Sequence, residues 1–154
     1  MNARTRLLGV DYGTVRIGLA VTDPDRSIAS PLTTYSRRGR DPDAAFFRLT
    51  AEREGIGEII LGLPVHLNGR EGPKAREARA FGQWLAGVTG LPVVFWDERF
   101  SSVEAEDFLL TAGLTSKRRK ARRDRVAAQI LLQSYLDAGC PGEQPLKPLD
   151  DAGE

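Results

Sequence analysis

The segment LLGVDYGTVRIGLAV, residues 7–21, contains the pattern that decides the fold. Leu7 to Val10 form a short apolar run that ends at Asp11, and the turn-forming residues Tyr12-Gly13-Thr14 follow. From Val15 to Val21, apolar residues alternate with arginine, glycine and alanine, which is the period of two typical of a strand with one buried face. Two such runs joined by a glycine-containing turn predict a β-hairpin.

Outward from this hairpin, short apolar runs alternate with helical patterns. Capping and turn-forming residues mark the boundaries between them. The predicted elements are a strand at Leu32–Tyr35, a helix with Asp41 as N-cap and Pro42 as its first residue that ends near Glu54, a strand at Glu58–Leu61, a helix at Pro73–Val88, a strand at Pro92–Trp96, a helix capped by Ser101 or Ser102, and a last helix from Arg122 or Arg123 to just before Gly139.

This order of elements predicts an α/β fold. The opening strands are joined by turns and should be antiparallel, whereas each later strand returns through a helix and should be parallel to its predecessor. We expect a five-stranded mixed sheet, its first three strands antiparallel, flanked by about four helices. Residues 1–138 should form one domain, and the proline-containing residues 139–154 a disordered C-terminal tail.

Length and composition exclude several classes of protein. The 154 residues fit a single domain. No apolar run approaches the roughly 20 residues of a membrane-spanning helix, which argues against a membrane-embedded protein. Cys140 is the only cysteine, so neither an internal disulfide nor a multi-cysteine zinc site can form. Because the first residues also lack a secretory cleavage pattern, we expect a cytoplasmic protein.

The net charge of +1 hides an uneven distribution. The segment Lys117–Arg125 reads KRRKARRDR and carries a charge of +6, so the rest of the chain sums to −5. A compact basic segment on an otherwise acidic molecule is typical of proteins that bind a phosphate backbone. By itself, the segment is equally compatible with a solvated run of charges.

Acidic residues stand at three places where an apolar pattern ends. Asp11 follows the first strand, Asp97 and Glu98 follow the last strand, and Asp124 begins the apolar stripe of the last helix. Each has an ordinary structural explanation: an Asx-turn for Asp11, a solvated strand end paired with Arg99, and a helix N-cap for Asp124. Successive strand residues face opposite sides, so one of Asp97 and Glu98 should share the side of Asp11, and the pattern does not say which.

Three carboxylates that meet at one place would repel one another unless a cation neutralised them. Oxygen ligands suit Mg²⁺ or Mn²⁺, and the lack of a cysteine and histidine cluster argues against zinc. Two such ions can activate a water molecule and stabilise the departing oxygen of a phosphodiester. The basic segment beside Asp124 would bring the polyanion to this site.

Four segments together resemble the YqgF/RuvX family of bacterial nucleases, which is part of the ribonuclease H-like superfamily. The resemblance covers roughly residues 7–136. The segments that carry it are LLGVDYGTVRIGLAVTD from Leu7, EIILGLPVHLNG from Glu58, VVFWDERFSSVEAE from Val93 and RRDRVAAQILLQSYL from Arg122. The sequence departs from the family pattern at His66, where many relatives have asparagine.

The resemblance implies a ribonuclease H-like sheet and a site in which Asp11, Glu98 and Asp124 are catalytic and bind Mg²⁺ or Mn²⁺. It thereby selects Glu98 over Asp97. It also implies a role in maturing the 5′ end of pre-16S ribosomal RNA, and by kinship with resolvases the family has been proposed to cut Holliday junctions.

Further residues are candidates for contact with nucleic acid. Thr14 lies beside Asp11 in the hairpin turn, and the guanidinium groups of Arg16 and Arg99 could bind phosphate. His66 could assist proton transfer, although a loop histidine without function is the commoner case. The candidates in the basic segment are Lys117, Arg118, Arg119, Lys120, Arg122 and Arg123. We expect residues 113–120 to be flexible and to become ordered only on a partner.

The sequence thus predicts a metal-dependent nuclease acting on structured RNA, with pre-16S rRNA as the expected substrate. One alternative is a resolvase of branched DNA, which would need paired active sites and hence a dimer. Another is a non-catalytic RNA-binding module in ribosome assembly. The DYGT turn is also similar to the phosphate loop of actin-like ATPases, but those proteins require a chain more than twice as long. The sequence leaves the oligomeric state open.

Overall fold

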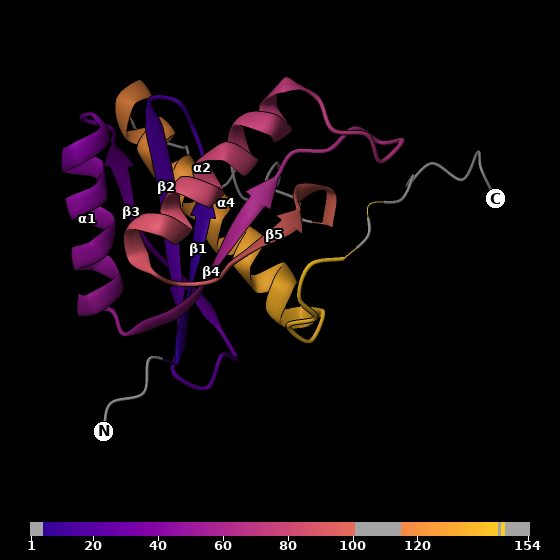
Figure 1. Cartoon of the computed structure of the whole chain (residues 1–154), viewed down its shortest axis with the longest axis horizontal. Helices are drawn as coiled ribbons and strands as arrows, with labels where there is room; N and C mark the ends of the chain where they lie inside the picture. Colours follow the sequence, from indigo (N-terminus) through magenta and orange to yellow (C-terminus); the bar gives the residue numbers. More distant parts are fainter. Residues whose placement is uncertain (1–4, 101–114, 145, 147–154) are drawn as a thin grey trace.

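The computed structural model describes residues 5–100, 115–144 and 146. The elements follow one another in chain order as strands and then alternating helices and strands (Figure 1). They are β1 (Arg6–Asp11), β2 (Arg16–Thr22), β3 (Ala29–Ser36), α1 (Arg40–Arg53), β4 (Ile56–Leu63), α2 (Pro73–Thr89), β5 (Val93–Asp97), the short 3₁₀ helix η1 (Glu98–Phe100) and α4 (Ser116–Asp137).

The five strands form one mixed sheet in the order β3-β2-β1-β4-β5. β1 pairs antiparallel with β2, and β2 with β3, whereas β1 and β4 are parallel, as are β4 and β5. The predicted sheet, with three antiparallel strands first, is therefore confirmed. The helix expected from Ser101 or Ser102 lies outside the described residues, and α1, α2 and α4 are the α-helices of the described part.

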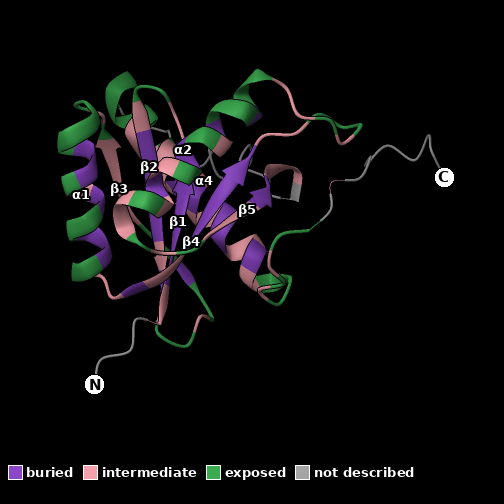
Figure 2. Cartoon of the chain, viewed as in Figure 1, coloured by how far each residue is buried: buried purple, intermediate pink, exposed green. Residues whose placement is uncertain are grey.

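Helices cover both faces of the sheet, and its strands are largely buried (Figures 1 and 2). The apolar residues between them form two layers. On one face, α1 and α2 pack through residues such as Phe47 and Leu85 against Leu8 and Val10 of β1. On the other face, α4 packs against the sheet through the buried residues Ala128, Leu131, Leu132 and Tyr135. Alternation along β1 explains this division, because successive side chains point to opposite faces.

Glycines in the hairpin allow α4 to lie directly on the sheet. A Cβ atom on Gly9 would come within 2.9 Å of the Cβ of Leu132, and one on Gly18 would collide with the backbone carbonyl of Asp124. Gly18 is the register partner of Asp11. The close approach therefore brings the start of the buried stripe of α4 beside the end of β1.

The predicted start of the last helix was wrong. α4 begins at Ser116, where the hydroxyl of the N-cap residue Thr115 accepts a hydrogen bond from the backbone N–H of Arg118. The segment expected to be flexible is thus helical from Ser116 onward, and residues 113 and 114 lie outside the described part. Lysine and arginine favour helices, but the first turns of α4 carry no apolar stripe that would reveal the helix in the sequence.

The helix α1 also starts earlier than predicted. Gly39, with φ of 115°, precedes it, and Arg40 rather than Pro42 is its first residue. Asp43, in the first turn, is fully buried.

At the other end of the chain, the N–H of Gly142 donates to the hydroxyl of Tyr135 at 3.0 Å. Within the described residues, no helix is both long and apolar enough to cross a membrane.

Candidate active site

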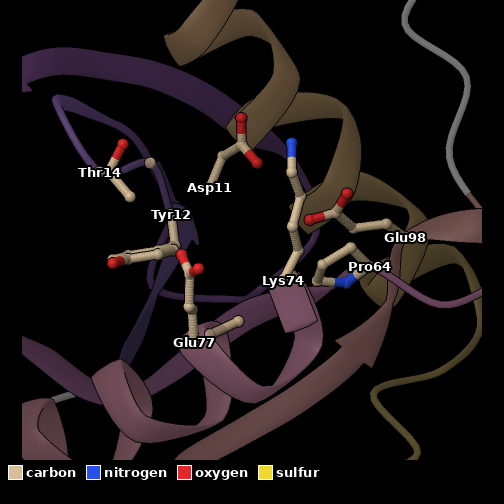
Figure 3. Close-up of a pocket in the computed structure, with 10 residues that line it drawn as sticks. Asp11, Tyr12, Thr14, Pro64, Lys74, Glu77 and Glu98 are labelled. Carbon is tan, nitrogen blue, oxygen red and sulfur yellow. The ribbon is translucent and has the colours of Figure 1, made fainter. Parts of the chain in front are cut away.

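A cavity of about 560 Å³ opens at the carboxyl ends of β1, β4 and β5 (Figure 3). These three strands are parallel, so their ends meet at one edge of the sheet. Such an edge is where α/β sheets usually bind ligands. The residues that line the cavity are Asp11, Tyr12, Gly13, Thr14, Gly62, Pro64, Lys74, Glu77, Ala78 and Glu98.

Asp11 and Glu98 face this cavity from the ends of β1 and β5. Burial, and then the nearby carboxylates of Glu98 and Asp124, raise the pKa of Asp11 to about 7. Burial and the charge of Asp97 raise the pKa of Glu98, while the charge of Lys74 opposes the shift. The site therefore concentrates negative charge that the protein compensates only in part.

Glycine at the end of β4 makes room for Glu98. A Cβ atom on Gly62 would lie 2.8 Å from Oε2 of Glu98. The short helix η1 follows β5 directly and points Glu98 toward this space. The side chain of Glu98 therefore reaches the same cavity as Asp11.

Asp97 pairs with Arg99 and is not among the described residues that line the cavity. Its carboxylate accepts hydrogen bonds from the guanidinium of Arg99, the shortest at 2.6 Å from Nη2, and from the backbone N–H of Arg99 at 2.9 Å. Both side chains are 7% exposed. Nη1 of Arg99 also donates to the carbonyl oxygens of His66 and Leu67, both at 3.0 Å. Arg99 thus ties the loop after β4 to η1, and these contacts leave little of it to meet a phosphate.

Asp124 lies close enough to Asp11 to raise its pKa, but its carboxylate faces Arg16. Oδ2 of Asp124 accepts a hydrogen bond from Nε of Arg16 at 2.7 Å. Asp124 is not among the described residues that line the cavity. Among residues 5–100, 115–144 and 146, no three histidine, cysteine, aspartate or glutamate side chains are grouped closely enough to hold a metal ion. Of the three carboxylates expected to meet at one place, Asp11 and Glu98 therefore share the cavity, whereas Asp124 is turned toward Arg16.

The chemistry of these groups nevertheless fits a hard divalent cation. The donors are carboxylate oxygens. Burial first, and then the charges of Glu98 and Asp124, raise the pKa of Asp11, and a bound cation would stabilise its anionic form against both effects. Asp11 and Glu98 share the cavity already, while Asp124 would need to turn away from Arg16 to join them. Mg²⁺ and Mn²⁺ are the ions that prefer such oxygen ligands.

Lys74 is a site residue that the sequence pattern did not reveal. It lies in the first turn of α2, one residue after Pro73, and its side chain extends between Asp11 and Glu98 (Figure 3). Its ammonium group supplies positive charge to Glu98. An isolated lysine near a helix start has many structural explanations, so only the predicted approach of α2 to the strand ends could have drawn attention to it.

The candidate contacts to nucleic acid fall into two places. Thr14 is exposed at the rim of the cavity. The basic residues Lys117, Arg118, Arg119, Lys120, Arg122 and Arg123 occupy the first two turns of α4. Arg118, Arg122 and Arg125 share one face of the helix, where with Ala121 they line a cavity of about 370 Å³. The helix therefore presents positive charge directly beside Asp124.

His66 and the two tryptophans have structural surroundings. The backbone N–H of His66 donates to the carbonyl oxygen of Arg70 at 3.0 Å, and its carbonyl accepts from Gly69 at 2.8 Å, so His66 closes the loop after β4. Trp96 is buried, and its indole N–H donates to Oγ of Ser134 at 2.8 Å. Trp84 is half-buried and packs against Phe81.

Comparison with known proteins gives a consistent result. A protein from Rhodopirellula baltica is 46% identical over 136 residues, which cover 88% of this chain and 79% of the relative. One from Cereibacter sphaeroides is 49% identical over 132 residues, covering 85% and 82%. Both carry the name "Putative pre-16S rRNA nuclease".

Among solved structures, the chain is similar to Thermus thermophilus RuvC in complex with a Holliday junction substrate. The TM-score is 0.57 at 15% identity, over 90% of this chain and 98% of that one, which shows a common fold and confirms the expected ribonuclease H-like architecture. The family model described as "RuvX: Holliday junction resolvase" matches residues 5–138. With this match and relatives at 46–49% identity, the chain belongs to the RuvX family.

Proposed function

We propose that the protein is a divalent-metal-dependent nuclease that hydrolyses phosphodiester bonds in structured RNA, with the 5′ end of pre-16S rRNA as its substrate. The observation that carries the proposal is the cavity shared by Asp11 and Glu98, in which burial and neighbouring carboxylates raise the pKa of Asp11 to about 7. The names of the relatives support the choice of RNA. A ribosomal precursor as substrate places the proposed reaction in the cytoplasm.

Asp11, Glu98 and Asp124 would hold the metal. The chemistry that Mg²⁺ or Mn²⁺ would supply there is activation of a water molecule and stabilisation of the departing oxygen of the phosphodiester. The basic first turns of α4 bind the phosphate backbone next to the site and orient it. At the rim, the hydroxyl of Thr14 and the neighbouring backbone N–H groups can donate to a phosphate oxygen.

Arg16 regulates the availability of the third carboxylate in this proposal. Its guanidinium binds Asp124 through Nε, and both side chains are partly exposed to solvent. A substrate phosphate can replace the carboxylate as the partner of Arg16, because guanidinium groups bind both with similar geometry. This exchange would free Asp124 to join Asp11 and Glu98.

The direct test is cleavage of a 5′-extended pre-16S RNA with Mg²⁺ or Mn²⁺. We expect the wild type to cleave, chelation to abolish cleavage, and Asp11→Asn to lower the rate at least about 100-fold while RNA binding persists. Asp25→Asn, an exposed aspartate in the turn between β2 and β3, is the matched control and should cleave as the wild type does. Equal cleavage by the Asp11 variant would remove this cavity from the mechanism. RNA binding without cleavage under either metal would instead favour the non-catalytic module.

Cleavage of a four-way DNA junction is the second candidate activity, and the description of the family model favours it. Symmetric cutting needs two active sites in a two-fold assembly. The same variants should therefore be assayed on a synthetic junction, with the assembly measured by analytical ultracentrifugation. Preference for the junction over the RNA, together with a dimer on the DNA, would replace the RNA substrate in the proposal.

A further inference from the structure

A second cavity, of about 420 Å³, adjoins the catalytic cavity. Tyr12 and Glu77 line both of them, so the two cavities are neighbours separated by these side chains. The second cavity lies between the end of β1, the start of α1 and the exposed side of α2. The residues that define it are Tyr12, Arg37, Arg40, Glu77, Phe81 and Trp84. We call it the aromatic pocket.

The guanidinium group of Arg37 is held in the wall of this pocket by two hydrogen bonds. Its Nε donates to Oδ2 of Asp43 at 3.2 Å, and its Nη1 donates to the hydroxyl of Tyr12 at 3.3 Å. Its central carbon lies 5.6 Å from the ring centroid of Tyr12 and 5.4 Å from that of Phe81. Within the described residues these hydrogen bonds use Nε and Nη1, which leaves Nη2 for a ligand.

A buried carboxylate holds Arg37 in this position. Asp43 is fully buried and also accepts hydrogen bonds from the hydroxyl of Tyr35 at 2.6 Å and from the backbone N–H of Arg38 at 2.9 Å. Burial alone would raise the pKa of Asp43, but these hydrogen bonds and the charge of Arg37 lower it overall. Asp43 is therefore an anion at neutral pH, and Arg37 is a preorganised cation rather than a mobile surface side chain.

The pocket combines the two kinds of group that bind a nucleotide. Arg37 and the exposed Arg40 supply positive charge for a phosphate, while the half-buried Trp84, which packs on the buried ring of Phe81, supplies aromatic surface for a base. Glu77, on the wall shared with the catalytic cavity, repels phosphate and can accept a hydrogen bond from the amino group of a base. These charges favour the phosphate on the arginine side and the base against Trp84.

We propose that the aromatic pocket binds a single unpaired nucleotide next to the bond that is cleaved. The proposal rests on the proposed function, because it assumes that a nucleic-acid strand crosses the catalytic cavity. A base must leave its helical stack to enter a pocket between Tyr12, the start of α1 and α2, so the pocket selects a single-stranded extension over a continuous duplex. It thereby adds recognition of strand structure to the basic helix α4, which binds phosphates of any sequence.

The test compares three RNA probes in EDTA, where the proposed metal-dependent cleavage is suppressed. The probes are a blunt hairpin, the same hairpin with a 5′ single-stranded extension, and one with abasic nucleotides in that extension. We expect the wild type to bind the extended hairpin about tenfold more tightly than either of the others, since stacking of one base provides an effect of this order. The extended probe should also quench tryptophan fluorescence, because Trp84 is the half-buried tryptophan and Trp96 lies in the core.

Variants of the pocket separate recognition from folding. Trp84→Ala and Arg37→Gln/Arg40→Gln should lose the preference for the extension, whereas Trp84→Phe should retain most of it because it keeps an aromatic ring. Arg40→Gln alone changes an exposed side chain and so should fold even if the double variant does not. It should reduce the preference for the extended hairpin in part. Arg38→Gln, an exposed neighbour outside the lining of the pocket, is the matched control and should bind as the wild type does.

Two results would overturn the proposal in distinguishable ways. The pocket would be rejected if the wild type bound all three probes with equal affinity, or if folded Trp84→Ala and Arg40→Gln proteins kept an unchanged preference. Neither result would decide the nuclease proposal, which is tested separately with Asp11→Asn. Failure of the wild type to bind any of the RNA probes would reject the pocket and the RNA substrate together.

Discussion

At the scale of single residues, the environment of Asp11 is unfavourable to its charge. Its pKa of about 7, raised by burial and by two nearby carboxylates, means that the folded protein holds a proton there which the unfolded chain releases near pH 4. Between these pH values the folded state binds more protons than the unfolded state. The free energy of unfolding without metal should therefore decrease as the pH rises from about 4 to 7.

This behaviour gives a prediction for Asp11→Asn. The substitution removes the carboxylate, so in EDTA the variant should be more stable than the wild type at pH 7 and about equal to it below pH 4. Each unit of the shift corresponds to about 1.4 kcal/mol, so a gain of a few kcal/mol is expected. Thermal unfolding followed by circular dichroism from pH 4 to pH 8 measures it, with Asp25→Asn as control. An identical pH profile for Asp11→Asn and wild type would show that the carboxylate is not strained.

Lys74 gives a second prediction at this scale. Its side chain extends toward the space between Asp11 and Glu98, and its ammonium charge acts on Glu98, so it would compete with a metal ion bound there (Figure 3). Lys74→Gln should tighten Mn²⁺ binding several-fold, in line with about 1 kcal/mol for a charge pair near a protein surface. Calorimetric titration with Mn²⁺ measures the affinity, and Arg76→Gln, an exposed cation on the same helix, is the control. Unchanged or weaker Mn²⁺ binding would show that the ammonium group of Lys74 does not compete with the metal ion.

At the scale of elements, the contact between β2 and α4 sets the geometry of the site. Gly18 faces the backbone of Asp124, and any side chain at this position would collide with it. Gly18→Ala should lower the free energy of unfolding by about 1–3 kcal/mol or more and displace α4 from β1, which should also weaken metal binding. Urea denaturation and Mn²⁺ titration measure the two effects.

The matched control for that substitution is Gly87→Ala. Gly87 lies on α2, and a Cβ atom there would have no neighbour within 4 Å. Alanine is the better helix former, so this variant should gain about 0.5–1 kcal/mol. If Gly18→Ala destabilised the protein no more than an ordinary surface substitution does, the close approach of α4 to β2 would be refuted.

The basic N-terminal turns of α4 give a prediction for the electrostatic binding of RNA. The exposed residues Lys117, Arg118 and Lys120 would each neutralise a phosphate, so their replacement by glutamine should weaken RNA binding and reduce its dependence on salt. The slope of log affinity against log salt should fall by about 0.7–0.9 for each phosphate that is no longer neutralised. Binding measured between 50 and 200 mM salt, about the range over which this effect is large, gives the slope.

Three exposed arginines elsewhere provide the control for α4. Arg48, Arg53 and Arg76 lie on α1 and α2, and their replacement by glutamine removes the same charge from other surfaces. If both triple variants showed the same reduced salt dependence, net charge rather than the basic helix would explain RNA binding.

At the scale of the whole molecule, the sheet gathers acids from distant parts of the chain into one edge. Asp11, Glu98 and Asp124 come from β1, η1 and α4 and approach one another only when the sheet and both helical layers are assembled. A metal that binds this assembled edge stabilises the folded state alone. At about 100 times its dissociation constant, such an ion adds about 2.7 kcal/mol.

The corresponding prediction is a rise in the melting temperature with metal. For a chain of this size, that free energy corresponds to an increase of about 5–10 °C for the wild type with saturating Mn²⁺. Asp11→Asn should lose most of the increase, whereas Asp25→Asn should keep it. A shift of the same size in all three proteins would indicate that Mn²⁺ binds elsewhere.

Local sequence patterns were sufficient to predict the hairpin, the mixed sheet and the acidic strand ends. Period-two alternation from Val15 to Val21 and the helical stripe after Asp124 each report which side of an element is buried. Family resemblance added the choice of Glu98 over Asp97, which alternation left open. In the structure Asp97 is paired with Arg99 and Glu98 faces the cavity, while the catalytic role of Glu98 stays a prediction.

The pairing of the polar side chains became apparent only in the folded molecule. The ion pair between Arg16 and Asp124, the approach of Lys74 to Glu98, and the hydrogen bond of Arg37 to Tyr12 all join residues that are far apart in the chain. Such pairs leave no periodic trace in the sequence, because a charged residue that faces solvent and one that faces a distant partner occupy the same positions of a helix or strand. Their partners become defined when apolar burial has fixed the packing of the sheet and helices, and the chemistry of the site follows from that packing.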